Sequence, residues 1–131
     1  MRVHAQVRSA AHAHEATVRT GEAAQALAIA ARADGRGSAV NGGELLMLAL
    51  ATCYCNDLYR EAARLGIAIT GVQVEASAEF AGIGLAARDI TYTARVESTA
   101  DPRDVQRLIA ETDAVAEIHN TVRAGVPVTL A

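Results

Sequence analysis

The sequence predicts an α+β fold in which antiparallel strands pack against a long helix. Residues 42–65 supply the first observation, because their N-terminal half is apolar on almost every side, which is typical of a buried helix. The second observation is the alternation of apolar and polar residues in segments 72–80 and 90–97. Such alternation is typical of an antiparallel pair with one polar face. The apolar face of this pair needs a cover, so we expect the helix to lie on it.

The composition limits the classes of protein that this chain can represent. Its 131 residues suit one domain, which we expect to span residues 1–131. A formal net charge of -3 offers no basic surface for nucleic acid. The apolar run at residues 45–51 is too short to cross a membrane, and the N-terminus lacks the apolar core of a signal peptide. We therefore expect a cytoplasmic location with no membrane partner. Aromatic residues make up only 3%, so small side chains bury little area and self-association is expected to add stability.

The region before the central helix reads as strands and a turn. Residues 2–8 and 14–20 are predicted as two strands. Residues 25–32 favour a third strand, although their alanine content also suits a helix. Residues 34–38 are predicted as a flexible turn, and Asn41 can cap the helix that follows.

The region after the strand pair is predicted to be mostly helical. Asp101 can cap a second helix whose first position is Pro102. A third helix is expected over residues 113–124, and residues 126–130 are predicted as a closing strand. Pro127 places that strand at a sheet edge, because proline cannot donate to a central ladder.

Both cysteines of the chain, Cys53 and Cys55, lie in the central helix. Helical residues two apart point about 200° away from each other, so a disulfide between them would require local unwinding. The same geometry makes a metal site from the two thiols poor, and we expect no metal and no organic cofactor. A buried free cysteine is usually only a small apolar side chain. Composition alone therefore favours a structural role.

Two segments resemble a known family. GGELLMLALATC, residues 42–53, is similar to the ELLLAALAxC signature of the OsmC/Ohr family, the osmotically inducible and organic-hydroperoxide-resistance proteins. HNTVRAGVPVTL, residues 119–130, is similar to the C-terminal stretch that reads SNTLRAGVPV in family members. The predicted order of helices and strands fits the family across the whole chain.

The resemblance implies an intertwined homodimer, in which antiparallel sheets wrap around two long central helices that lie side by side. It places the active sites at the dimer interface. In the family, a first cysteine is oxidised by organic hydroperoxides to a sulfenic acid, and a second cysteine resolves it as a disulfide. An arginine and a glutamate bracket the first thiol.

These family positions carry over only in part. Cys53 matches the peroxidatic cysteine, whereas the resolving position falls on Ala116, and no cysteine follows it. The chain therefore resembles a subgroup without the second cysteine, which implies recycling by an external thiol reductant or a degenerate activity. The glutamate of many peroxidases falls on Gly43, and Glu44 stands one residue later. Glu44 is a polar partner for an arginine or simply a first-turn acid that favours the helix dipole.

Several accessory residues stay open as alternatives. Arg19, Arg32 and Arg36 are candidates for the activating arginine. Cys55 is either a packed core residue or a replacement for the resolving thiol. His119 stands where the family has serine, and is a local base, a polar lid, or a surface or interface residue.

The electrostatic neighbourhood of Cys53 within its own helix is unfavourable for a thiolate. Asp57 lies one turn away, and a negative neighbour raises the pKa of a thiol. Activation must therefore come from outside the helix, and we expect at least one arginine to approach the sulfur.

The sequence supports two functions. The leading hypothesis is a hydroperoxide reductase that uses Cys53, with apolar walls at Leu46, Leu50 and Tyr54 that suit a fatty or aromatic hydroperoxide. The alternative is a non-catalytic dimer that binds a small apolar ligand at the interface pocket, with Cys53 in a structural role.

Overall fold

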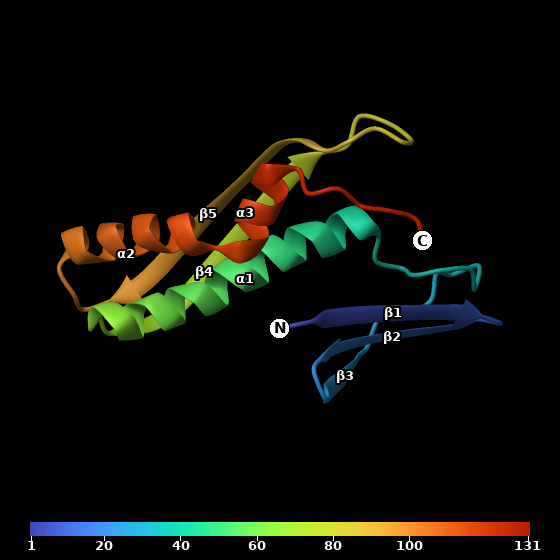
Figure 1. The fold of residues 1–131 in the computed structure, drawn as a ribbon, viewed down its shortest axis with the longest axis horizontal. Helices are drawn as coiled ribbons and strands as arrows, with labels where there is room; N and C mark the ends of the chain where they lie inside the picture. The colour runs from blue at the N-terminus through green and yellow to red at the C-terminus, as the bar shows by residue number, and fades with distance from the viewer. The chain divides into compact units, whose positions relative to one another are not determined.

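A computed structural model describes residues 1–131, which form two compact units, Met1–Glu44 and Leu45–Ala131. Figure 1 labels the elements of both units. Three helices and two antiparallel sheets are present, which confirms the predicted α+β class. No helix combines the length and the apolar character needed to span a bilayer.

The first unit is a three-stranded antiparallel sheet in the order β1-β2-β3. The strands are β1 (Val3–Ala10), β2 (Ala13–Thr20) and β3 (Ala23–Leu27). The first two confirm the predicted strands. Among the residues of this sheet only Ala16 is buried, so the unit has almost no core of its own.

The prediction of a third strand over residues 25–32 was wrong in its second half, because β3 ends at Leu27. The chain then folds back in a loop, in which the Arg32 amide donates to the Gly37 carbonyl at 3.0 Å. Gly35 and Gly37 have positive φ, which glycine adopts without the steric cost of a Cβ. These glycines explain why the turn predicted at residues 34–38 forms here.

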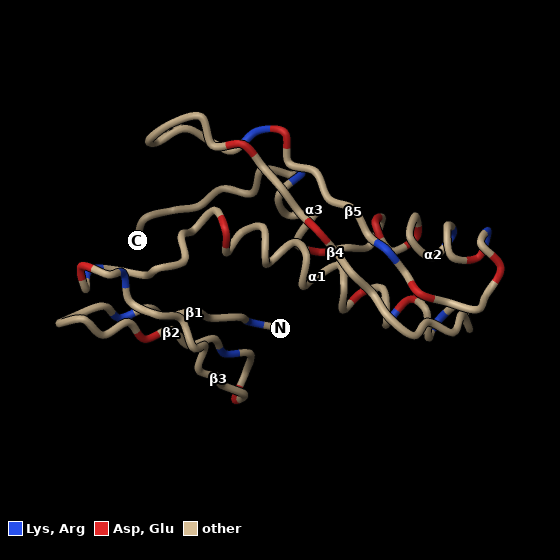
Figure 2. The backbone as a smooth tube through the Cα atoms, turned by 180° about the vertical axis from the view of Figure 1, so that it is seen from behind, with Lys and Arg blue, Asp and Glu red and all other residues tan.

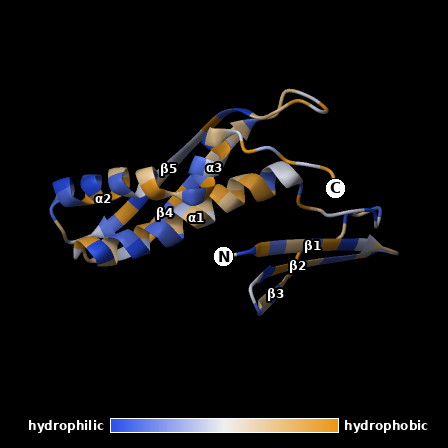
Figure 3. Ribbon diagram, in the orientation of Figure 1, coloured by the Kyte–Doolittle hydropathy of each residue, from blue (hydrophilic) through white to orange (hydrophobic).

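Helix α1 (Gly42–Leu65) has the predicted bounds. Its start is a reciprocal capping box, in which Asn41 Oδ1 accepts from the Glu44 amide and Glu44 Oε2 accepts from the Asn41 amide, both at 2.9 Å. Gly66, with a φ of 67°, ends it. Figure 3 shows the N-terminal half of α1 as mostly apolar and the C-terminal half as mixed.

The second unit holds its core between α1 and one strand pair. Strands β4 (Ile69–Glu79) and β5 (Arg88–Ser98) are antiparallel; both begin before the predicted segments and end within one residue of them. Their apolar side chains pack against a buried cluster, which confirms that the helix covers the apolar face of the pair. The cluster consists of Tyr54, Leu58, Ala62, Leu108 and Ala116.

Helices α2 (Pro102–Val115) and α3 (Glu117–Ala124) follow the strand pair. The Asp101 side chain caps α2 by accepting from the Arg103 amide at 2.8 Å, as predicted. The predicted start of the third helix at residue 113 was wrong. Extended backbone at Ala116 separates the two helices instead, because this buried alanine joins the core between them.

The closing strand predicted at residues 126–130 was also wrong, since residues 126–131 form no strand. The β4–β5 sheet has only two strands and takes no third one from this tail. Pro127 further removes one amide donor from any ladder. The tail leaves Val126, Val128 and Leu130 exposed.

Charged residues cover the polar side of the second unit. Figure 2 shows acidic and basic residues together along α2 and the C-terminal half of α1. They include a chain of ion pairs in which Arg64 bonds Glu61 at 2.5 Å and Glu111 at 2.8 Å. The Glu61 side chain is only 8% exposed, whereas Arg64 and Glu111 are exposed or half-buried. Exposed pairs add little stability one by one.

Candidate functional site around Cys53

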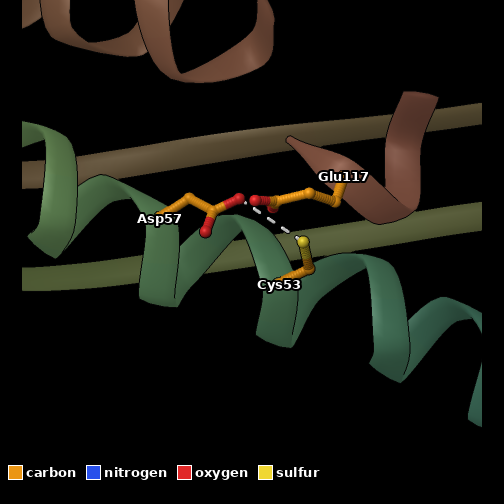
Figure 4. Close-up of side chains that lie close together, drawn as sticks. All are labelled: Cys53, Asp57 and Glu117. Atoms are coloured by element: carbon orange, nitrogen blue, oxygen red, sulfur yellow. Dashed lines mark hydrogen bonds between the residues drawn. The ribbon is translucent and has the colours of Figure 1, made fainter. Parts of the chain in front are cut away.

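The thiol of Cys53 lies partly buried in the middle of α1 and contacts a carboxylate. Its Sγ donates a hydrogen bond to Asp57 Oδ2 at 3.4 Å, as Figure 4 shows. The two residues are four apart on one helix, so their side chains lie on the same face. The side chain of Asp57 is only 8% exposed, so this contact is shielded from water.

Glu117 adds a second carboxylate from another element. It is the first residue of α3, and one of its oxygens, one oxygen of Asp57 and the Cys53 sulfur lie within 4.8 Å of one another. Sequence reasoning missed Glu117. The signal was its place directly after Ala116, the position where the resemblance puts a residue that reaches the first thiol.

Arg60 binds both carboxylates of this cluster. Its Nη1 lies 2.9 Å from Asp57 Oδ1 and 3.5 Å from Glu117 Oε1, and its Nε contacts Glu61 at 3.2 Å. Because Arg60 holds one oxygen of Asp57, the other oxygen is left to face the sulfur. One face of α1 thus carries three side chains at helical spacing that contact one another in sequence: Cys53, Asp57 and Arg60.

Burial is the main cause that raises the pKa of the Cys53 thiol. A hydrogen bond from the Ile118 backbone acts in the opposite direction and lowers it. Asp57 and Glu117 both raise the thiol pKa, as expected for negative neighbours. Burial also raises the pKa of the Asp57 carboxyl, while Cys53 and Arg60 favour its ionised form.

The other predicted site residues lie in several parts of the chain. Glu44 belongs to the capping box of α1. Arg32 and Arg36 lie in the loop of the first unit, and their approach to the thiol stays a prediction. Within the second unit the sulfur bonds Asp57, and Arg60 reaches it only through that carboxylate. Cys55 is a free, partly buried thiol, turned about 200° from Cys53 around the helix.

His119 is buried next to the site, with 4% of its surface exposed. Its ring packs on Tyr54 and Tyr92, with centroids 5.6 Å and 4.4 Å away. Neither ring nitrogen has a hydrogen-bond partner. The imidazole of His119 is therefore part of the packing between α1 and β5, and His119 is not a surface residue.

A groove of about 600 Å³ lies between α1 and the strand pair. Cys53 does not line it, because Ala51 faces the groove and residues two apart point to opposite sides of a helix. The thiol and the groove are thus separate features. The groove is lined by Met47, Leu48, Ala51, Val74, Glu75, Ala76, Ser77, Thr91, Tyr92 and Thr93.

The Cys53 cluster contains the donor atoms that a divalent metal could use, namely one sulfur and carboxylate oxygens. Arg60 already supplies positive charge to both carboxylates. A bound cation would have to compete with this guanidinium, so we assign no metal to the site.

Comparison with known proteins agrees with the fold. The family model for OsmC-like proteins matches residues 35–131. The chain therefore belongs to the OsmC-like protein family. A search among curated proteins gave no significant match.

Several solved structures share the fold. An OsmC-like protein from Mycoplasma pneumoniae superimposes with a TM-score of 0.70 at 14% identity, covering 94% of this chain and 88% of that chain. An organic hydroperoxide resistance protein OsmC from Legionella pneumophila gives 0.60 at 18% identity, with 99% and 95% covered. The organic hydroperoxide resistance protein OhrB of Bacillus subtilis gives 0.57 at 20% identity, with 99% and 96% covered.

Proposed function

We propose that this protein is a cysteine-based hydroperoxide reductase that acts as a cytoplasmic homodimer. The observation that carries the proposal is the Cys53 thiol, which ends the segment that resembles the family signature and donates a hydrogen bond to a carboxylate at 3.4 Å. A structural cysteine would instead be expected among apolar side chains. The names of the Legionella and Bacillus neighbours agree with this chemistry.

The proposed reaction is a two-electron reduction of a peroxide. The Cys53 sulfur attacks the terminal oxygen of an organic hydroperoxide, an S–O bond forms, and the O–O bond breaks. The products are the Cys53 sulfenic acid and an alcohol, whose hydroxyl takes up the thiol proton. Two equivalents of an external thiol then regenerate Cys53 and give one disulfide and one water. Because Ala116 occupies the position of the resolving cysteine, the external thiol attacks the sulfenic acid directly and not an internal disulfide.

Exposed apolar side chains support the proposed homodimer. Val3 and Val7 are each 62% exposed on β1, and Leu48 is 59% exposed on the apolar half of α1. A sheet with almost no buried residue gains little stability alone, and burying these side chains against a second copy would supply it.

A single-turnover experiment tests the function. Reduced protein is mixed with one equivalent of an aromatic hydroperoxide, and loss of free thiol is followed by mass spectrometry. The wild type and Cys55→Ser are expected to form a sulfenic acid at the same rate, while Cys53→Ser is expected to react only at the background rate. Full hydroperoxide consumption by Cys53→Ser would rule out the proposal.

The groove favours a second function, the binding of a small apolar ligand without catalysis. Its volume suits a small molecule, and it lies on the face of α1 opposite the thiol. An apolar fluorescent dye is the probe. If the groove binds ligands, Ala51→Phe is expected to weaken dye binding while Cys53→Ser leaves it unchanged. Equal dye binding by all three proteins would exclude this function.

A further inference from the structure

We propose that Asp57 is a catalytic residue that carries the proton from the Cys53 thiol to the oxygen that leaves the hydroperoxide. The inference rests on the proposed function. It assigns a catalytic step to a residue whose only effect expected from the sequence is to raise the pKa of the Cys53 thiol. It starts from the direct contact between Cys53 Sγ and Asp57 Oδ2, at 3.4 Å.

The two oxygens of Asp57 have different partners. Arg60 holds Oδ1 at 2.9 Å, whereas Oδ2 faces the sulfur. This arrangement fixes the rotation of the carboxylate, so that the oxygen that can accept the thiol proton is directed at the sulfur. Arg60 acts here as a positioning residue.

Burial of the Asp57 side chain favours proton transfer across its contact with the Cys53 thiol. Because the side chain of Asp57 is 8% exposed, little water competes for the thiol proton. Burial also raises the pKa of Asp57 above its ordinary value, which favours proton uptake by a carboxylate that must accept the thiol proton. The charged groups that face Cys53 and Asp57 are Arg60 on α1 and Glu117 on α3, with His119 nearby on α3.

As the Cys53 sulfur bonds to the terminal peroxide oxygen, its S–H bond breaks and the proton passes to Asp57 Oδ2. The O–O bond breaks and its electron pair goes to the departing alkoxide. Asp57 then protonates that alkoxide, which leaves as the alcohol and restores the carboxylate. Sulfur is oxidised by two electrons and the peroxide is reduced by two.

This role resolves an apparent conflict at the site. Asp57 raises the pKa of the thiol and so reduces the fraction of thiolate. An enzyme that relied on preformed thiolate would gain from losing this carboxylate. A proton carrier, in contrast, works on the thiol form that the carboxylate favours.

Two measurements on Asp57→Asn separate these possibilities. The pH dependence of Cys53 alkylation by monobromobimane reports the thiol pKa, and stoichiometric oxidation by an aromatic hydroperoxide reports the chemical step. We expect the thiol pKa to fall, because a negative neighbour is removed, while the oxidation rate at neutral pH falls by roughly tenfold to a hundredfold. A rate that is unchanged, or that rises with the thiolate fraction, would overturn the proposal.

A matched control is Glu111→Gln, which removes one carboxylate from α2 that bonds Arg64 and Arg107. It is expected to change neither quantity. Wild-type protein supplies a second test that needs no variant. Between the pKa of Asp57 and that of the thiol, the oxidation rate is expected to be nearly independent of pH, whereas a pure thiolate reaction would rise about tenfold per pH unit. A tenfold rise would overturn the role of Asp57 and leave the function of Cys53 standing.

Discussion

The imidazole ring of His119 lies against the phenol ring of Tyr92, with the ring centroids 4.4 Å apart and neither imidazole nitrogen hydrogen-bonded. Burial is the main cause that lowers the pKa of His119, and Arg123 lowers it further. Asp113 and Asp57 act in the opposite direction. The ring is thus held in its neutral form between α1 and β5.

This burial predicts a loss of stability in mild acid. Below about pH 6.5, the unfolded chain takes up a proton at His119 that the folded chain does not, so the free energy of unfolding falls as the pH decreases. His119→Phe keeps an aromatic ring in place but cannot titrate. Thermal unfolding at pH 7.5 and pH 5.5 is expected to show a Tm drop several degrees smaller in the variant. The same drop in both proteins would show that other groups cause the acid sensitivity.

The carboxylate of Glu117 is expected to slow the reaction of the Cys53 thiol with alkylating reagents. This carboxylate raises the pKa of Cys53, although burial and Asp57 contribute more. Glu117→Gln is therefore expected to lower the thiol pKa and to speed alkylation of Cys53 at neutral pH by roughly two- to threefold, a small effect because this side chain is largely exposed. The control is Glu15→Gln on β2. Slower alkylation of Glu117→Gln would mean that this carboxylate does not face the sulfur in solution.

The position of Ala116 leads us to expect that a cysteine placed there can act as a resolving thiol. It is fully buried directly before Glu117 and Ile118, the two α3 residues that act on the Cys53 sulfur. In Ala116→Cys, one equivalent of hydroperoxide is expected to produce a disulfide from Cys53 to the new thiol, since a sulfenic acid condenses with a neighbouring thiol. Peptide mapping would detect it. With Ala116→Ser as the control, a sulfenic acid that persists in both variants would contradict the prediction.

The burial of Leu108 predicts that truncating its side chain lowers the free energy of unfolding strongly. It is fully buried against the α1 residues Tyr54 and Leu58. Leu108→Ala is expected to lower the free energy of unfolding by about 2–5 kcal/mol, because it removes apolar contacts and leaves a cavity. Leu85 is 60% exposed, so Leu85→Ala is expected to change the free energy of unfolding by less than about 0.5 kcal/mol. Denaturant unfolding compares the two, and equal effects would contradict the assigned core.

Local signals made α1 predictable from the sequence. The capping box at Asn41 and Glu44 and the positive φ of Gly66 depend on residues within one turn of the helix ends. The period-two pattern likewise revealed β4 and β5, because one face of that pair is buried. These features need no information from distant parts of the chain.

Long-range contacts were not predictable in the same way. Asp57 was visible as a neighbour of Cys53 because helical spacing fixes it, but the approach of Glu117 depends on how α3 packs on α1. The tail after Gly125 has an alternating pattern, yet a strand needs a free sheet edge beside it, which pattern alone does not supply.

The two carboxylates beside Cys53 also bear on damage by excess peroxide. A sulfinic acid is anionic at neutral pH, and placing that charge next to Asp57 and Glu117 costs electrostatic free energy. The first oxidised form, a sulfenic acid, is neutral and avoids this repulsion. If Cys53 is oxidised as proposed, these carboxylates oppose the further step to a sulfinic acid, in a chain with no cysteine at Ala116 to trap the sulfenic acid.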